Sequence, residues 1–373
     1  MGILGVIVEY NPLHNGHLHH LSLAKEITKA QFTIAVMSGN FLQRGLPACL
    51  GKFARTKLAL EHGVDIVIEL PALYATSAAN YFATGAVGLL NALNVDWLVF
   101  GSETGELDAL QNLADTKEDD DFAKDFKSNL KQGFSYSSAQ IRTSKYSELA
   151  LPNNILGIEY LRALKQSNSK IEPFVVQREQ SYTSATEINK KLQNSKSVGS
   201  VESVDSIKKD VPKATFDIIN DIIKESHVPT LNSYSQIFHY RLLQEKGKLH
   251  EFLDVTEGIE NRILKMAREH FYLQDILDAT KTKRYTKAKL QRIATHILLD
   301  IKKKDMETWP TAPYVRVLGL KKSAAHLLGR ATLPIVTNVY KSYHPLLEKD
   351  IKAEEIYYLG TQKREIKHLF IVT

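Results

Sequence analysis

Short apolar runs alternate with helical patterns along the first part of the chain. The apolar runs are rich in β-branched residues: Ile3–Val8, Phe32–Met37, Val64–Leu70 and Val95–Phe100. Helical patterns follow three of them, through Leu18, Leu21 and Leu23, over Ala54–Leu60, and over about Ala75–Leu93. Strands that alternate with helices in this way predict a parallel β-sheet with helices on both faces. Ligands of such sheets bind at the carboxyl ends of the strands, so we expect a site at that edge.

The pattern changes at a serine-rich stretch, Ser195–Ser206, whose composition is typical of a linker. From Ile207 onward the strand pattern fades, and long helical patterns dominate over Ile259–Ala279 and Lys287–Ile301. No segment repeats at a fixed period. The sequence therefore predicts two domains, an α/β domain over residues 1–195 and a mostly helical domain over residues 207–373.

The junction between the first strand and the next helix carries His14-Asn15-Gly16-His17, an H-x-G-H sequence. Two imidazoles three residues apart at a helix entry can face one bound phosphate chain, beside the free N–H groups of the helix end. Gly16 removes a side chain where a nucleotide has to come close. Positioned donors stabilise the charge that develops when an α-phosphate is attacked. The motif therefore favours nucleotidyl transfer, with His14 and His17 as the catalytic residues.

Two other interpretations of these histidines stay open. They are surface residues of a turn, or they bind zinc together with the neighbouring His19 and His20. Zinc is the weakest of the three interpretations, because no cysteine pair and no H-E-x-x-H motif accompanies the cluster. The sequence has no G-x-x-x-x-G-K-[ST], and no G-x-G-x-x-G follows the first strand. We therefore expect H-x-G-H to be the phosphate motif, without a metal site.

Composition narrows the class of protein. Of the 373 residues, 43% are hydrophobic and 24% are charged, which is ordinary for a globular protein and argues against wholesale disorder. No segment is apolar over the length that crosses a bilayer. The single cysteine, Cys49, excludes an intrachain disulfide and fits a reducing cytoplasm. The net charge of +6 and the pI near 9.0 weakly favour a polyanionic partner.

Longer blocks of sequence are more specific than H-x-G-H alone. Six of them follow in order: VEYNPLHNGH (Val8–His17), AVMSGNFLQRG (Ala35–Gly45), KFARTKLAL (Lys52–Leu60), GVDIVIELP (Gly63–Pro71), FGSE (Phe100–Glu103) and LPNNILGIEY (Leu151–Tyr160). Two more lie near the end of the chain, KRYTKAKLQR (Lys283–Arg292) and YVRVLGL (Tyr314–Leu320). In these blocks the chain resembles the tRNA(Met) cytidine acetate ligase family, a bacterial branch of the HxGH nucleotidyltransferases.

The resemblance implies a Rossmann-like nucleotidyltransferase domain with a parallel sheet, followed by a mostly helical, basic domain that binds tRNA. It also implies a two-step reaction. ATP and acetate first give acetyl-adenylate and pyrophosphate, and the acetyl group then passes to the exocyclic amine of the wobble cytidine in elongator tRNA(Met), which becomes N4-acetylcytidine. ATP is expected to come with magnesium, and the reaction to run in the cytoplasm, without a membrane or a stable protein partner.

The ATP site implied by the resemblance has one continuous part and three separate residues. Gly101 ends a strand where bare backbone can approach adenosine, Asn153 bonds ribose or base, and Arg178 offers a forked donor to phosphate. Without the resemblance, these three residues have ordinary roles as a turn, a helix cap and a solvated side chain. The expected ATP-binding residues are Ile7, Val8, Glu9, Tyr10, Asn11, Pro12, Leu13, His14, Asn15, Gly16, His17, Leu18, His19, His20, Gly101, Asn153 and Arg178.

Other polar residues are placed to form a pocket for phosphate or acetate. Ser184 and Thr186 precede a helical pattern, where hydroxyls bind phosphate in this superfamily, although a simple helix N-cap is the commoner role. Lys52 and Arg55 touch the triphosphate or the tRNA, or they belong to a solvated helix face. The possible phosphate or acetate pocket comprises Asn40, Gln43, Arg44, Lys52, Ser184 and Thr186.

One position departs from the family's pattern. The second motif of the superfamily commonly ends in a basic residue, whereas this chain has Asn189, followed by Lys190 and Lys191. The segment between Arg178 and Ser184 is also short for the family. Either a neighbouring lysine makes the phosphate contact, or catalysis is weaker than in relatives.

Basic residues gather in the second half of the chain. Six of them and no acidic residue lie between Lys281 and Arg292, with Tyr285 interleaved, which fits phosphate tracking and base stacking on RNA. A solvated basic helix face is the commoner explanation of such a run. A smaller basic cluster consists of Lys321, Lys322, His326 and Arg330. The predicted tRNA-binding residues are Lys281, Lys283, Arg284, Tyr285, Lys287, Lys289 and Arg292.

Two functions stay open besides an acetate ligase. A small-molecule adenylyltransferase, of the kind that makes dinucleotide or pantetheine cofactors, rarely needs a second helical domain with a basic stretch. A non-catalytic RNA-binding protein with a relic nucleotide site is kept open by the departure at Asn189.

Overall fold

A computed structural model describes residues 2–115, 128–129, 139, 143, 150–179, 181–193, 205–225, 228–282, 284–341, 343–362 and 369–372. Of the expected linker Ser195–Ser206, all but the last two residues lie outside this part of the chain. None of the described helices combines the length and the apolarity that crossing a bilayer requires.

The described residues build one sheet of eight strands, in the order β5-β4-β1-β2-β3-β6-β7, with β8 paired to β6. The strands are β1 (Ile3–Val8), β2 (Phe32–Ser38), β3 (Ile66–Leu70), β4 (Trp97–Ser102), β5 (Glu172–Gln177), β6 (Val315–Lys321), β7 (Ile335–Val336) and β8 (Phe370–Val372). The first five strands run parallel, and β6 runs antiparallel to β3. The expected α/β fold with a parallel sheet is confirmed, and β6 is an antiparallel addition that the sequence pattern did not predict.

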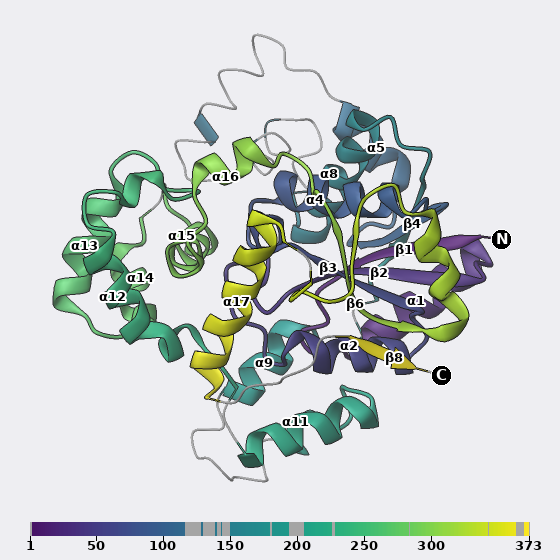
Figure 1. Ribbon diagram of the computed structural model, residues 1–373, viewed down its shortest axis with the longest axis horizontal. Helices are drawn as coiled ribbons and strands as arrows, with labels where there is room; N and C mark the ends of the chain where they lie inside the picture. Colours follow the sequence, from purple (N-terminus) through teal and green to yellow (C-terminus); the bar gives the residue numbers. More distant parts are fainter. Residues whose placement is uncertain are drawn as a thin grey trace.

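Helices cover both faces of this sheet (Figure 1). Along β2 the side chains alternate between two hydrophobic cores, Ile34 and Val36 in one and Ala35 and Met37 in the other. A strand buried on both faces is apolar at every position, which is why the sequence pattern identified it. The helices around the sheet are α1 (Asn15–Thr28), α2 (Lys52–Glu61), α3 (Ala72–Ala75), α4 (Ala79–Ala92), α5 (Leu107–Asp115), α8 (Pro152–Gln166), α9 (Ala185–Gln193) and α11 (Lys213–Glu225).

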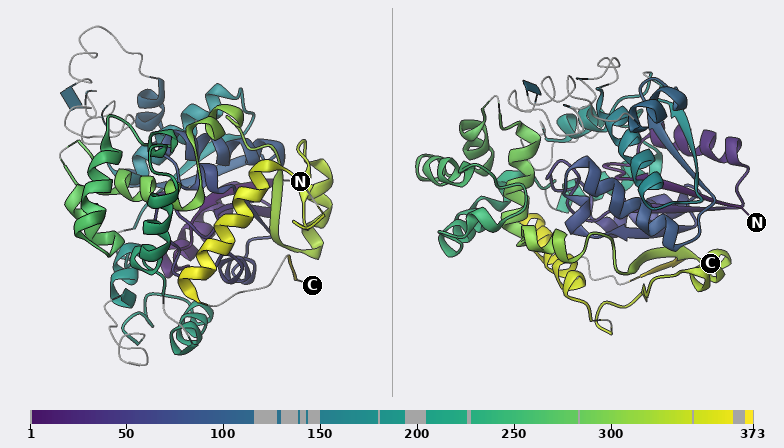
Figure 2. Two further views of the ribbon diagram at one scale, coloured as in Figure 1. Left: turned by 60° about the vertical axis from the view of Figure 1, so that its left-hand side comes forward. Right: turned by 90° about the horizontal axis from the view of Figure 1, so that it is seen from above.

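A second group of helices lies on the side of the sheet away from the N-terminus (Figures 1 and 2). Because β1 starts at the N-terminus and the strands beside it are parallel, this is the side of their carboxyl ends. The group contains η2 (Leu231–Tyr234), α12 (Ser235–Gln244), η3 (Leu249–Glu251), α13 (Ile259–Glu269), α14 (Leu273–Thr280), α15 (Lys287–Leu299) and α16 (Lys303–Thr308). The single helix expected over Ile259–Ala279 is wrong, because extended backbone at His270 and Tyr272 separates α13 from α14.

The last part of the chain returns to the sheet. β6 pairs with β3, η4 (Lys322–Arg330) follows it, and α17 (Pro345–Thr361) then runs between the helical group and the sheet (Figure 1). The sheet thus contains strands from both sides of the division that we expected near residue 200. The region after residue 207 therefore contributes to the helical group and also to the edge of the α/β layer.

Buried charges join α2, β3, β6 and α17. Lys52 Nζ lies 2.8 Å from Glu69 Oε1 and 2.7 Å from Glu354 Oε2. Arg316 approaches the same two carboxylates, Glu69 at 2.9 Å without hydrogen-bond geometry and Glu354 at 3.1 Å. Burial alone would lower the pKa of Arg316, but these carboxylates raise it, so the guanidinium stays charged. A buried charge is tolerated when it is paired, so this cluster fixes β6 and α17 against the sheet.

Candidate active site

A cavity of about 980 Å³ lies at the carboxyl ends of β1, β4 and β5. Its other walls come from α1, α8, α9, the segment 42–47 and the first turns of α15. The structure brings most of the predicted site residues together there. Those that line the cavity are Ile7, Val8, Glu9, Tyr10, Asn11, His14, Gly16, His17, His19, His20, Gln43, Arg44, Gly101, Asn153, Arg178, Ser184, Thr186, Lys287 and Arg292.

Four residues of the predicted ATP site do not line the cavity: Pro12, Leu13, Asn15 and Leu18. Leu13 is only 1% exposed and belongs to the core below the turn. The side chain of Asn15 donates to the backbone carbonyl of Lys209 at 2.9 Å. The side chains of Leu13 and Asn15 thus hold the turn to its surroundings, and the structure places all four residues outside the cavity lining, against their assignment as direct ligands.

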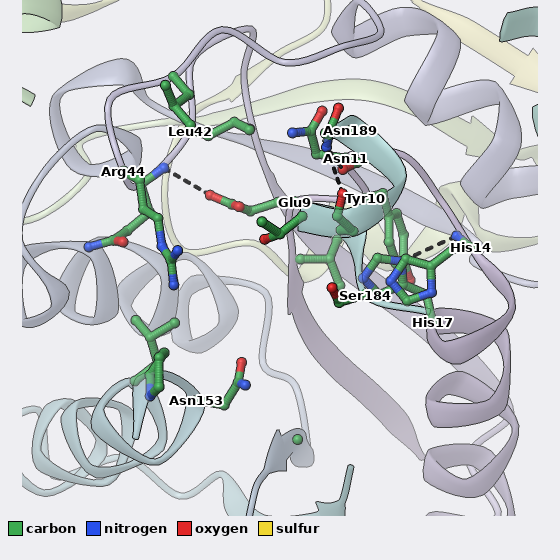
Figure 3. A pocket seen from close by; sticks show the side chains of 18 of the residues that line it. Glu9, Tyr10, Asn11, His14, His17, Leu42, Arg44, Asn153, Ser184 and Asn189 are labelled. Carbon is green, nitrogen blue, oxygen red and sulfur yellow. Dashed lines mark hydrogen bonds between the residues drawn. The ribbon is translucent and has the colours of Figure 1, made fainter. Parts of the chain in front are cut away.

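The H-x-G-H turn fixes both imidazoles through backbone hydrogen bonds (Figure 3). His14 is the N-cap of α1, and its Nδ1 accepts from the Gly16 N–H at 3.0 Å, while His17 Nδ1 accepts from the His14 N–H at 3.3 Å. The rings stack with centroids 3.7 Å apart. A neutral imidazole that accepts at Nδ1 carries its proton on Nε2. Each ring therefore keeps an Nε2–H donor for a ligand of the cavity.

Burial keeps the histidines of this turn neutral. It lowers the pKa of His14 to about 4, with Arg178 adding to the shift, and it lowers the pKa of His20 to about 4. The pKa of His17 falls well below its ordinary value for the same reason, helped by the neighbouring His14. At neutral pH the turn thus presents uncharged donors.

These shifts make stability depend on pH. Between pH 6.5 and about 4 the unfolded chain binds protons at His14 and His20 that the folded chain does not, so stability falls as pH falls. Each group contributes up to about 1.4 kcal/mol per pH unit. We expect the free energy of unfolding, measured in urea at several pH values, to fall less steeply with falling pH in a His14→Asn, His20→Gln double variant than in the wild type. The comparison removes the effect of groups that both proteins share, such as Asp350. The raised pKa of Asp350, about 6, makes stability increase as pH falls. An equal pH dependence of the free energy of unfolding in the two proteins would contradict this account.

Gly101 and Arg178 lie beside each other in the wall of the cavity. The Arg178 N–H donates to the Ser102 carbonyl at 2.8 Å, which places its side chain beside Gly101. A Cβ at Gly101 would lie 3.4 Å from Arg178 Cγ and 3.7 Å from His20 Cδ2, ordinary contact distances. A side chain at Gly101 would thus not clash with the protein. Because glycine has no side chain, the space beside Gly101 is available to a ligand.

Asn153 lines the cavity at the start of α8, but its amide is partly engaged. Its Nδ2 donates to Glu103 Oε1 at 2.7 Å, and the backbone N–H groups of Asn153 and Asn154 donate to the two carboxylate oxygens. Glu103 thus caps α8, and the Oδ1 of Asn153 is the atom left for a ligand. In the part of the chain that is described, no three His, Cys, Asp or Glu side chains gather to hold a metal ion.

Comparison with known proteins decides the family. A family model described as HIGH Nucleotidyl Transferase matches residues 1–369. Two curated relatives named tRNA(Met) cytidine acetate ligase are 40% identical, one from Caldicellulosiruptor saccharolyticus over 96% of this chain and 94% of its own, the other from Caldanaerobacter subterraneus subsp. tengcongensis over 99% and 98%. The chain belongs to the tRNA(Met) cytidine acetate ligase family. The crystal structure of Thermotoga maritima TmcAL bound with alpha-thio ATP superposes over the full length of both chains, with a TM-score of 0.88 and 31% identity.

In this member of the ligase family, the second motif lies at the start of α9. Ser184 Oγ donates to Glu187 Oε2 at 2.7 Å, and the Glu187 N–H donates to Ser184 Oγ at 3.3 Å. The Ser184 N–H also donates to Glu187 Oε2, at 3.0 Å, which completes a capping box. The two hydrogen bonds that Glu187 Oε2 accepts from Ser184 lower the pKa of the Glu187 carboxyl. Ser184 therefore caps the helix while its side chain borders the cavity.

The departure at Asn189 has a structural role. Its Nδ2 donates to the carbonyls of Asn11 at 2.7 Å and Ala185 at 2.9 Å, and so ties α9 to the H-x-G-H turn. Of the two following lysines, Lys191 is paired with Asp210 at 2.7 Å, whereas Lys190 is exposed and lines the cavity. Of these two lysines, Lys190 is therefore the one that borders the cavity.

Two residues of the predicted phosphate or acetate pocket are wrong. Lys52 is 1% exposed and engaged in the buried charge cluster, and Asn40 is 3% exposed, with its Oδ1 accepting from the Lys52 N–H at 2.7 Å. Neither lines the cavity. Arg55 is also fully buried and donates to the Glu9 carbonyl at 2.7 Å. These cations point into the sheet because α2 turns this face toward the core.

The structure also corrects part of the predicted RNA contacts. Tyr285 is 7% exposed and its hydroxyl donates to the Thr256 carbonyl at 2.7 Å, so it has no face for base stacking. Arg292 is 8% exposed, and its Nε donates to Asp254 at 2.7 Å. Lys283 lies outside the described residues.

The remaining basic residues are more accessible. Lys281, Arg284 and Lys287 are exposed, the latter two beside Glu257 and Asp278, and Lys289 lies over the Tyr285 ring. The smaller cluster lies at the other edge of the sheet, where Lys321 pairs with Asp65 just before β3. Only the first set is near the cavity, which Lys287 lines.

Sequence reasoning missed cavity residues that come from the helical group. Val228, Pro229, Thr230, Leu231, Gln274 and Gln291 all line it. Apart from Gln291, which lies in the block Lys283–Arg292, they belong to none of the sequence blocks named above. The segment 42–47 packs on α15, where Thr295 Oγ1 donates to the Gly45 carbonyl at 2.8 Å, and so joins the helical group to the site.

Proposed function

We propose that this chain activates acetate with ATP and transfers the acetyl group to the wobble cytidine of elongator tRNA(Met). ATP and acetate form acetyl-adenylate and pyrophosphate, and the exocyclic amine of the cytidine then displaces AMP. The observation that carries the proposal is that one cavity is lined both by the H-x-G-H turn and by α15 of the basic stretch. Family membership supports the same reaction, because the curated relatives are named for it.

The residues of the turn suit the first step. The Nε2–H groups of His14 and His17 would donate to oxygens of the α-phosphate, where charge develops, and the N-terminus of α1 adds backbone donors. Arg178 and Lys190 would hold the leaving pyrophosphate. Magnesium would arrive with ATP, held by the triphosphate oxygens.

The RNA substrate would be held by its backbone outside the cavity. Lys281, Arg284 and Lys287 are our proposed phosphate contacts. An anticodon loop already presents an unstacked base, which can enter the site at a low cost in pairing energy. This reaction would run in the cytoplasm, where tRNA and ATP are present.

The test is mass analysis of tRNA(Met) nucleosides after incubation of the purified protein with ATP and acetate. We expect N4-acetylcytidine, together with acetate-dependent release of pyrophosphate. Turnover of ATP on a phosphorylated small molecule, without an effect of tRNA, would instead identify an adenylyltransferase. Binding of tRNA without turnover would identify a non-catalytic protein.

Gly16→Ala should separate stability from activity. A Cβ at this position would lie 2.9 Å from His14 Cε1 and 3.2 Å from Tyr182 Cβ, so the His14 ring has to move. Alanine also stabilises a helix over glycine by about 0.5–1 kcal/mol. We expect pyrophosphate release to fall by about 10²-fold, since displacement of a catalytic group by 1 Å costs on that order. Unfolding in urea should show stability within about 1 kcal/mol of the wild type, because the helix propensity of alanine counters the weakened cap at His14. Full activity would show that the position of the His14 ring does not matter.

A further inference from the structure

Glu9 is the acidic side chain of the cavity that remains available to a substrate. Among the described residues, the acids that line the cavity are Glu9, Glu103 and Glu179. Both oxygens of Glu103 accept hydrogen bonds from the start of α8. Glu179 lies at the rim, with a side chain that is 52% exposed and 3.2 Å from His19.

The carboxylate of Glu9 is held by one oxygen only. Its Oε1 accepts from the Gln43 N–H at 2.8 Å, and no hydrogen bond within the described chain reaches Oε2. Figure 3 shows Glu9 between the two imidazoles and Arg44. Glu9 therefore lies between two parts of the cavity. One part is beside the H-x-G-H turn, where we place the nucleotide, and the other is formed by the segment 42–47 and α15.

The size of the cavity allows two reactants to meet there. Small-molecule sites occupy roughly 300–1,000 Å³, and this cavity of about 980 Å³ is at the upper end. It has room for an adenylate and for a second planar group entering from the α15 side.

We propose that Glu9 accepts the proton that the attacking amine loses in the acetyl-transfer step, an assignment that rests on the proposed function. The N4 nitrogen of cytidine forms a bond to the acetyl carbonyl carbon, and the bond from that carbon to the phosphate oxygen breaks. AMP leaves with the electron pair. The nitrogen gives up one of its two protons to Oε2 of Glu9, which becomes a carboxylic acid and later returns the proton to water.

The other polar groups of the turn are unsuited to this role. The Nδ1 atoms of His14 and His17 already accept backbone hydrogen bonds, and their Nε2 atoms carry protons, so these rings donate. His20 lies against Gly101 on the nucleotide side. Burial raises the pKa of Glu9, although Gln43, Arg55 and Arg44 oppose the shift. A base whose pKa rises toward the working pH accepts protons more effectively.

The test is Glu9→Gln, which keeps the size of the side chain and an oxygen to accept from Gln43. The first step is measured as acetate-dependent ATP–pyrophosphate exchange. The second is measured as single-turnover transfer of labelled acetyl groups from preformed acetyl-adenylate on the enzyme to tRNA(Met). We expect the transfer rate to fall by about 10²–10⁴-fold and no longer to increase with pH. The factor by which the exchange rate falls should be at least about ten times smaller.

Glu26→Gln is the matched control, because Glu26 is an exposed carboxylate of α1 outside the cavity. It should change neither step. Transfer and exchange that fall in parallel in Glu9→Gln, or a transfer rate that keeps its rise with pH, would overturn the assignment. Wild-type protein without acetate-dependent exchange would overturn the proposed function instead, so the two failures are distinct.

Discussion

Replacing His17 by glutamine is expected to lower the rate of acetate-dependent pyrophosphate release by about 10²–10³-fold, the loss typical of one preorganised donor to a developing charge. His17 is partly buried, and its Nε2–H is the donor that the capping of α1 leaves free. Glutamine at this third helical position also accepts from the N-cap N–H, as in an ordinary capping box. The fold should therefore survive, and the lost rate reports the missing imidazole.

His14→Asn isolates the other imidazole in the same way. Asparagine is a good N-cap residue, so it keeps the hydrogen bond from the Gly16 N–H while removing the ring. A control is His326→Gln, an exposed histidine of η4 on the opposite edge of the sheet, which should leave the rate unchanged. Unfolding curves should be similar for all three variants. Wild-type rates in both His17→Gln and His14→Asn would show that another group stabilises the transition state.

Replacing Lys52 by methionine is expected to lower the free energy of unfolding by about 3–5 kcal/mol, the cost of removing one partner from a buried ion pair. Lys52 is 1% exposed, and without it the carboxylates of Glu69 and Glu354 share Arg316 alone. Urea unfolding monitored by circular dichroism measures the change.

Lys57→Met is the matched control on the same helix. Lys57 is 52% exposed, and its Nζ lies 3.8 Å from Glu61, a surface pair worth at most about 1 kcal/mol. A second substitution, Glu69→Gln on top of Lys52→Met, should restore part of the lost stability, because it removes the one negative charge that Arg316 alone leaves uncompensated. A loss below about 1 kcal/mol in Lys52→Met would show that water or neighbouring groups reach the cluster.

The features that the sequence predicted are those with a local cause. Strands such as Phe32–Ser38 are apolar because both faces are buried, and the two imidazoles of H-x-G-H accept hydrogen bonds from residues within three positions. Both were predicted from short windows. The β6 strand was missed because its place in the sheet depends on β3, far earlier in the chain.

Residues with distant partners were assigned wrongly for the same reason. From sequence alone, Lys52 resembles a solvent-facing or phosphate-binding lysine, although it pairs with Glu354 in the structure. Tyr285 likewise resembles a stacking platform, although its hydroxyl donates a hydrogen bond to the Thr256 carbonyl. Side-chain chemistry can be read from a sequence, whereas burial of a single cation or ring is decided by packing between remote segments.

The late strand β6 also sets when the protein can assemble during its synthesis. Lys321, at the end of β6, pairs with Asp65, which is 256 positions earlier. At roughly 5–20 residues per second, a ribosome needs about 13–50 s to cover that distance. Over this period β3 has an open edge and Glu69 lacks Arg316, so the nascent N-terminal segment is exposed to strand pairing with other chains. The order of translation thus delays a complete catalytic unit until nearly the whole chain has emerged.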